Sequence, residues 1–297
     1  MQKNENEKIS EWDKKFWPES LFQIPQIPKS LKIRGEFNNY YGSADFVRLC
    51  VVGPRKYSDY GQAVCQKIIS GLSNFPITIV SGLAYGIDSI AHQTALENNI
   101  HTIAVLGSGL SDETIYPKAN LSLAKQILDS GGCLISEFEN NFSATNWSFP
   151  QRNRIMVGIS DAVLIIETSQ KSGTMITARL ATDYNKEIMT VPGSIFSENN
   201  SGSNLLIKDG ANVILESKDV LEILGFEIKI KNDSSISKNF ANLSENEIKI
   251  LNCINIPKTI SEIIAETKLS IATINATISL LEFKELIHFL EDKICKK

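Results

Sequence analysis

Two arginines, one residue apart in the stretch FPQRNRI at residues 149–155, have the clearest capacity for binding chemistry in this sequence. A guanidinium is always charged, so Arg152 and Arg154 each need an anionic or hydrogen-bond-accepting partner. The run AVLII at 162–166 predicts a buried strand nearby, where an unpaired charge is costly. Side chains two apart on a helix face different ways. We expect Arg154 to bind an anionic ligand and Arg152 to be paired within the protein.

Small-residue turns follow four of the apolar runs. They read GPRK at 53–56, SGLAYGID at 81–88, GSGL at 107–110 and ETSQKSGTMITA at 167–178. Glycine lets backbone N–H groups approach an anion, and the helix N-termini that follow add positive partial charge. Neither GxGxxG nor GxxxxGK[ST] is present, so conventional dinucleotide or Walker-type nucleotide binding is not expected. Four such turns at one edge of a sheet predict an anion site.

Basic side chains cluster near these turns and outnumber the acidic groups available to neutralise them. The six basic residues are Arg55, Lys56, Arg152, Arg154, Lys171 and Arg179. Three carboxylates, Asp88, Asp161 and Glu167, are their candidate ion-pair partners. Phe149 adds an aromatic face suited to stacking on a nucleobase. The set therefore favours a phosphate-bearing ligand.

No catalytic residue is predicted. Asp88 and His92 are four residues apart and resemble an acid–base pair. Asp88 is better explained as an acidic residue in the first turn of a helix, where the helix dipole favours a negative charge. Glu137 and Glu167 follow strands and are expected to orient the arginines.

Composition narrows the class of protein further. The 297 residues are 42% hydrophobic and 22% charged, with a formal net charge of −4, so nucleic acid would be held by a local basic cluster rather than by bulk charge. The cysteines are widely spaced and predict core thiols, with no disulfide framework, metal site or cofactor. These are Cys50, Cys65, Cys133, Cys253 and Cys295. The chain has no signal peptide or membrane-spanning run, so a cytoplasmic protein is expected.

The elements that position these residues form an α/β fold. Short, nearly unbroken apolar runs alternate with helical patterns, which predicts a parallel sheet with helices on both faces. The predicted strands are 47–52, 77–80, 102–106, 133–136, 162–166, 187–191 and 212–214. Ligands bind beyond the carboxyl ends of such strands, where the glycine turns and arginines lie.

Four segments are expected along the chain. Residues 1–45 contain prolines that prevent a long helix and predict an arm packed on the next domain, residues 46–227. A polar linker at 228–242 leads to a smaller domain at 243–297. There, Ser244 with Glu247 predicts a capping box, and Ser261 and Ser270 are expected to cap two further helices. A terminal hairpin would make this domain a winged helix-turn-helix.

Seven blocks in order resemble the bacterial DNA-processing family DprA, also called Smf, over residues 17–225. The blocks are VVGPRKYSDYG, IVSGLAYGIDSIAH, TIAVLGSGLSDETIYP, ISEF, FPQRNRIMVGIS, SGTMITARLA and VPGSIFSENNSGSNLLIKDGA. The resemblance implies an extended Rossmann-like, doubly wound domain. It also implies a homodimer that protects incoming single-stranded DNA during natural transformation and loads the RecA recombinase, without catalysis.

Carried over by position, the resemblance implies a DNA-binding pocket built from the turns after the strands and from the stretches FPQRNRI and SGTMITARLA. Its members would be Gly53, Arg55, Gly82, Gly107, Phe149, Arg152, Asn153, Arg154, Lys171, Ser172, Gly173, Thr174 and Arg179, beside the basic Lys56. Pro54 departs from the family, which usually has Ser or Thr there, so one phosphate contact is in doubt. The N-terminal region is short, so we expect little room for the extra helical module that some members place before the Rossmann-like domain.

Two other functions compete with this interpretation. Nucleoside-monophosphate phosphoribohydrolases share an arginine stretch and a glycine–threonine helix start, but they need a glutamate soon after it. Here Gly173 and Thr174 are followed by Met, Ile, Thr and Ala.

The second competing function is that of a transcription regulator, whose recognition helix would be IATINATISLLE. That helix has no Lys or Arg, so sequence-specific duplex binding is not expected.

Overall fold

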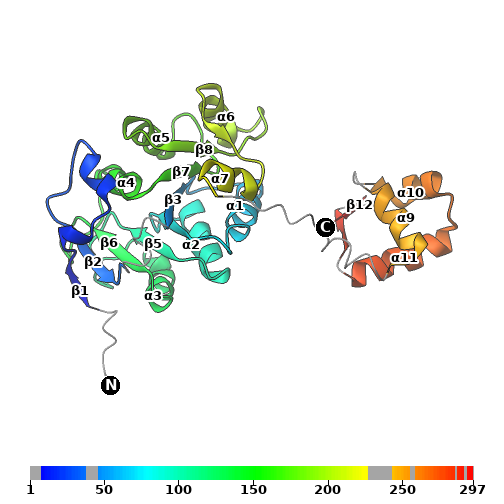
Figure 1. Cartoon of the computed structure of the whole chain (residues 1–297), viewed down its shortest axis with the longest axis horizontal. Coiled ribbons are helices and arrows are strands. Elements are labelled where there is room, and N and C mark those ends of the chain that lie inside the picture. The colour runs from blue at the N-terminus through cyan, green and yellow to red at the C-terminus, as the bar shows by residue number, and fades with distance from the viewer. Residues whose placement is uncertain are drawn as a thin grey trace, which may run out of the picture. The chain divides into compact units, whose positions relative to one another are not determined.

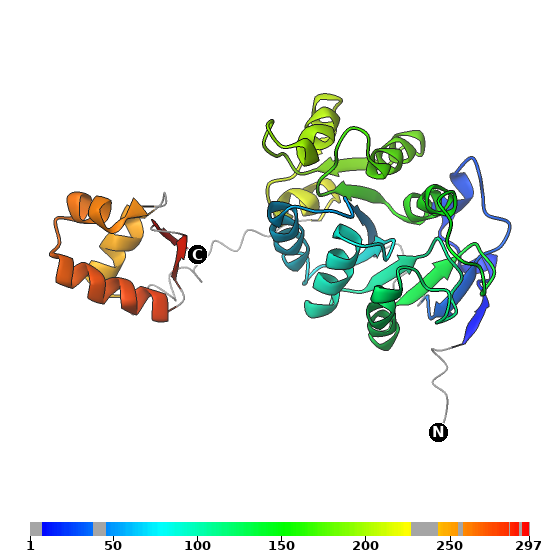
Figure 2. The ribbon, with the colours of Figure 1, turned by 180° about the vertical axis from the view of Figure 1, so that it is seen from behind.

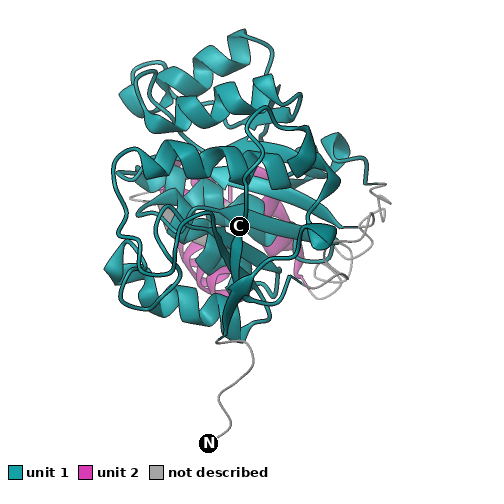
Figure 3. Cartoon of the chain, turned by 90° about the vertical axis from the view of Figure 1, so that its left-hand side faces the viewer, with its two compact units in different colours: residues 1–228 teal, residues 229–297 magenta. Residues whose placement is uncertain are grey.

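The computed structural model describes residues 8–37, 46–226, 243–254, 258–284, 286–290 and 293–296. The chain forms two compact units, residues 1–228 and 229–297, coloured separately in Figure 3. The predicted linker at 228–242 lies outside the described residues.

Unit 1 is built on a mostly parallel nine-stranded sheet in the order β1-β2-β6-β5-β4-β3-β7-β8-β9. Its strands are β1 (Ile9–Glu11), β2 (Lys32–Gly35), β3 (Val47–Val52), β4 (Ile77–Ser81), β5 (Thr102–Val105), β6 (Cys133–Ser136), β7 (Ala162–Ile165), β8 (Glu187–Thr190) and β9 (Asn212–Val213). The seven predicted strands are confirmed to within a residue or so at each end. They pair in parallel, as their apolar character predicts.

Helices cover both faces of this sheet (Figures 1 and 2). They are α1 (Asp59–Ser70), α2 (Ile87–Glu97), α3 (Leu121–Asp129), α4 (Ser148–Ile159), α5 (Gly173–Asp183), α6 (Ser201–Lys208) and α7 (Ser217–Ile223). Alternate residues of each strand enter different cores, because successive side chains point to opposite faces. In β3, Leu49 and Val51 pack with α1, α2 and α7, whereas Cys50 and Val52 pack with α4 and α5. The α/β prediction is therefore confirmed.

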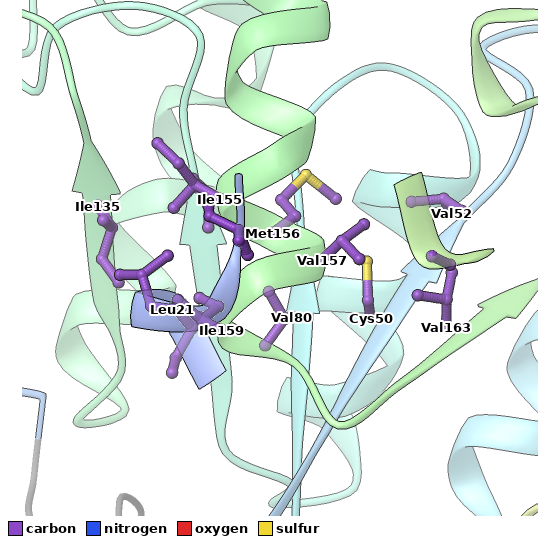
Figure 4. Close-up of a cluster of buried hydrophobic side chains, with 14 of the residues drawn as sticks. Leu21, Cys50, Val52, Val80, Ile135, Ile155, Met156, Val157, Ile159 and Val163 are labelled. Carbon is purple, nitrogen blue, oxygen red and sulfur yellow. The ribbon is translucent and has the colours of Figure 1, made fainter. Parts of the chain in front are cut away.

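The N-terminal segment completes the core that contains Cys50, Val52, α4 and α5, and it extends the sheet. Trp12, Trp17, Leu21 and Ile24 are buried in one cluster with residues of α4. Trp17 follows the short helix η2 (Lys14–Phe16), and Leu21, shown in Figure 4 among side chains of α4, belongs to η3 (Glu19–Gln23). Strand β2 then pairs antiparallel with β6, and β1 pairs with β2. Neither strand was predicted. The arm thus becomes an edge of the sheet, close to the arginine stretch of α4.

The described residues of unit 2 form the helices α9, α10 and α11 and a small antiparallel sheet in the order β10-β12-β11. Its elements are α9 (Glu245–Cys253), β10 (Lys258–Thr259), α10 (Ile260–Thr267), α11 (Ile271–Phe283), β11 (Ile287–Leu290) and β12 (Lys293–Lys296). The Ser244 capping box and the Ser270 cap are confirmed. The Ser261 cap is wrong, because Thr259 caps α10 and forms a capping box with Glu262. The winged-helix assignment stays a prediction.

Candidate functional site

A hollow of about 300 Å³ opens beyond the carboxyl ends of β3 and β7. Strand β3 lies between β4 and β7, and the chain builds one half of the sheet on each side of it. The hollow therefore occupies the topological switch point, where ligands bind in open α/β sheets. It is lined by Val52, Gly53, Pro54, Arg55, Ala84, Asp88, Phe149, Pro150, Arg152, Asn153, Met156, Ser172, Gly173, Thr174, Ile176 and Thr177.

The N-terminus of α5 supplies backbone donors to this hollow. Ser172, Gly173 and Thr174 all line it. No side chain caps the helix, since the Ser172 hydroxyl contacts that of Thr168 instead. The first N–H groups of a helix lack internal acceptors and carry positive partial charge, so they are suited to an anion such as phosphate.

Arg152 is the buried cation of the hollow. Its side chain extends from α4, and its Nη1 donates to the Val105 carbonyl at 2.5 Å. The Arg152 Nε has no hydrogen-bond partner among the described residues. A Cβ on Gly82 would lie 1.8 Å from Nη1, so only glycine leaves space for this guanidinium. Gly82 therefore acts by making room for Arg152, and it does not line the hollow itself.

Arg154 occupies a different environment from Arg152. Its Nη2 donates to both carboxylate oxygens of Glu137 at 2.5 Å, and its Nη1 donates to the Gln26 carbonyl at 2.5 Å. The guanidinium is thus bound to β6 and to the N-terminal segment, and it does not line the hollow. Arg154 was expected to face the ligand, but it is paired inside the protein, and Arg152 lines the hollow as well as donating to the Val105 carbonyl. The two side chains are two residues apart on α4 and point in different directions.

Asp88 is a buried carboxylate in the lining of the hollow, and its charged neighbour Arg152 is one of the cations for which the sequence made it a candidate partner. Burial raises the pKa of Asp88, while the Arg152 charge and the backbone N–H groups of Ala84 and Gly82 oppose that shift. His92, one turn further along α2, is fully buried, and its Nδ1 lies 2.7 Å from the Thr102 hydroxyl. Burial and the Arg152 charge lower the pKa of His92 to about 3, so this ring is neutral near pH 7. His92 is not among the residues that line the hollow.

Arg55 and Phe149 form a cation–aromatic pair at the mouth of the hollow. The Arg55 guanidinium carbon lies 4.8 Å from the centre of the Phe149 ring. A Cβ on Gly107 would lie 2.9 Å from that ring, so Gly107 leaves space for Phe149, as Gly82 does for Arg152. Asn153 also faces the hollow and donates to the Thr177 hydroxyl at 3.1 Å. A cation above an aromatic ring suits a ligand that carries both a phosphate and a base.

Other predicted basic residues lie outside this hollow. Lys56 lines a neighbouring depression together with Arg55, and Arg179 lines a separate one between α5 and α6. Lys171 is exposed beside Ser172 without lining the hollow. Glu167, expected to orient an arginine, instead accepts hydrogen bonds from the backbone N–H and hydroxyl of Ser58, which caps α1.

Neither a cluster of metal ligands nor a membrane-spanning helix occurs in the part of the chain that the structure describes. It contains no group of three or more His, Cys, Asp or Glu side chains placed to bind a metal ion. None of its helices combines the length and apolarity needed to cross a bilayer. The five cysteines are buried as free thiols.

Comparison with known proteins identifies relatives across most of unit 1. The family model described as DNA recombination-mediator protein A matches residues 8–225. Protein Smf of Escherichia coli is 38% identical over 214 residues, which cover 72% of this chain and 56% of that protein. DNA processing protein DprA of Streptococcus pneumoniae is 38% identical over 205 residues, covering 69% of this chain and 70% of that protein. The chain thus spans little more than half of the Escherichia coli relative.

Two solved structures share this architecture. The X-ray structure of DNA processing protein A from Streptococcus pneumoniae has a TM-score of 0.65 at 34% identity, covering 75% of this chain and 76% of the other. The structure of DNA processing protein A from Helicobacter pylori has a TM-score of 0.65 at 28% identity, covering 73% and 96% respectively. The latter concerns the single-stranded DNA binding mode of the Helicobacter pylori protein.

Proposed function

Because this chain belongs to the DNA recombination-mediator protein A family, we propose that it binds single-stranded DNA in the hollow between β3 and β7. The observation that carries the proposal is the combination of donors there. Arg152 lies at the base, Arg55 lies over the Phe149 ring, and the uncapped N-terminus of α5 lines one wall. These groups bind phosphate and nucleobase without reading sequence.

The wider role that we propose follows the family. The protein protects incoming single strands in the cytoplasm during natural transformation and recombination, and delivers them to the RecA recombinase. A homodimer would place two hollows on one strand, so avidity would strengthen binding to strands long enough to reach both.

We propose no catalytic step at this site. The phosphoribohydrolase alternative needs a carboxylate soon after Gly173 and Thr174, and α5 continues with Met175 and Ile176. Among the described lining residues Asp88 is the one carboxylate, and burial raises its pKa while the neighbouring Arg152 charge and two backbone N–H groups oppose that shift. Because Asp88 is buried beside Arg152, we assign it to orienting that guanidinium. Release of a free base from nucleoside monophosphates by the purified protein would contradict this assignment.

The direct test compares a fluorescent single strand with its duplex by anisotropy over a range of salt concentrations. We expect tighter binding of the single strand, with log K falling against log salt by about 0.7 per phosphate contact. Arg55→Ala should weaken binding and reduce the slope by about one contact. Arg48→Ala is the matched control, since it removes the same charge from the opposite end of β3, where Arg48 pairs with Asp161 at 3.1 Å. A slope near zero, or equal losses in the two variants, would reject the hollow.

A further inference from the structure

A second hollow adjoins the first, and Arg55 lines both of them. It measures about 580 Å³ and is formed by the loop after β3 and by the turn that opens α2. Its lining contributes two cations, and no carboxylate is among the described residues there. The lining residues are Arg55, Lys56, Tyr57, Tyr85, Gly86, Ser89 and Ile90.

Two tyrosines present aromatic surface to solvent in this second hollow. Tyr57 is 42% exposed and Tyr85 is 46% exposed. They belong to different loops, yet they line the same depression together with Lys56 and Arg55. Nearby Tyr60 is equally exposed, but its hydroxyl donates to the Pro192 carbonyl at 2.8 Å, on the side of β8. Exposed aromatic rings beside cations are the surface that single-stranded nucleic acid uses for stacking.

The two loops that carry the tyrosines are packed backbone to backbone. Gly86 has a φ of +83°, and a Cβ there would lie 2.3 Å from the Pro54 carbonyl oxygen. The Ile87 N–H donates to that same oxygen at 3.3 Å. Tyr85, which immediately precedes Gly86, is therefore held close to Arg55 by the main chain. A surface formed in advance binds its ligand without an ordering cost.

We propose that this second hollow is a nucleobase subsite, in which Tyr57 and Tyr85 stack on bases of a strand that leaves the first hollow across Arg55. The inference rests on the proposed function and extends it by naming where the strand continues. Continuity supports it, because Arg55 lines both hollows. Charge also supports it, because Lys56 and Arg55 line the same hollow as the rings and supply phosphate partners there.

The test uses oligothymidylates of two lengths, about 4 and about 12 nucleotides, in the range that single-strand sites occupy. On the longer strand, Tyr57→Ala and Tyr85→Ala should each weaken binding by about 5- to 150-fold, the range observed for loss of one stacked base. On the shorter strand, held by the first hollow, both variants should bind as the wild type does. Tyr85→Phe keeps the ring and should retain wild-type affinity. Tyr60→Ala is the control for loss of an exposed tyrosine and should have no effect.

The outcomes separate this inference from the proposed function. If the wild type binds single strands with the expected salt slope but both tyrosine variants match it at both lengths, the subsite is rejected and the first hollow stands. If the wild type binds no single-stranded DNA, the proposed function itself fails. If the variants change the sedimentation behaviour of the free protein and leave DNA affinity unaltered, the tyrosines form a self-association surface, and the subsite is again rejected.

Discussion

Replacing Arg154 tests the assignment of the two arginines most sharply, because the structure makes this residue a buried structural cation. Arg154→Ala leaves the Glu137 carboxylate without its cation and the Gln26 carbonyl without its donor. The two side chains of the ion pair are 7% and 16% exposed. Breaking a buried pair costs about 3–5 kcal/mol, and the partial exposure of Glu137 places this case near 3 kcal/mol. For a unit of this size the melting temperature should fall by about 6–12 °C.

The assay combines denaturant unfolding with anisotropy of a single-stranded oligonucleotide, measured where the variant is still folded. Arg154→Ala should lose stability and retain most of its DNA affinity. The double variant Arg154→Met, Glu137→Leu removes both charges and should recover most of the lost stability. Arg48→Ala breaks a more exposed pair with Asp161 and should cost about 1 kcal/mol or less. Wild-type stability with lost DNA binding in Arg154→Ala would refute the assignment and restore Arg154 as the ligand residue.

Three further predictions concern the residues around the hollow. Gly82→Ala should weaken single-strand binding by about 10-fold or more, because its Cβ displaces the Arg152 guanidinium; unchanged affinity by anisotropy would contradict this. Pro54→Ser adds a hydroxyl and an N–H at the turn and should tighten binding by about 5-fold, and a weaker complex would show that the proline is preferred. The lowered pKa of His92 predicts that the free energy of unfolding falls as the pH drops from 6.5 towards 3, by up to about 1.4 kcal/mol per pH unit. The reason is that the unfolded histidine binds a proton that the folded one does not. A His92→Gln variant with the same pH slope would exclude that cause.

The parallel sheet could be predicted because both faces of its strands are buried. Runs such as AVLII in β7 are apolar throughout, and each is followed by a turn that fixes its end. Strands β1 and β2 could not be predicted in the same way, since they are short, β2 pairs with β6 from far away in the sequence, and β1 pairs only with β2. Their pairing depends on tertiary contacts that no local pattern encodes.

Several of the residues predicted for the site do lie at one edge of the sheet, but their contacts differ from those expected. Strand ends and glycine turns place Arg55, Arg152 and Phe149 near one another, and the structure brings them to one hollow. Which arginine faces it depends on where Glu137 lies, and that carboxylate comes from a different strand end. The roles of Gly82 and Gly107 are likewise contacts with α4, so they are visible only once that helix is in place.

Photocrosslinking of a single strand that carries 4-thiothymidine, followed by identification of the linked peptides, tests the central claim most directly. Binding in the hollow between β3 and β7 predicts crosslinks to Phe149 and to residues 53–57 of the neighbouring loop. Excess unlabelled single strand should abolish them, and Arg152→Ala should reduce them. Crosslinks confined to residues 243–297, with none in the loop after β3 or at the start of α4, would contradict the account.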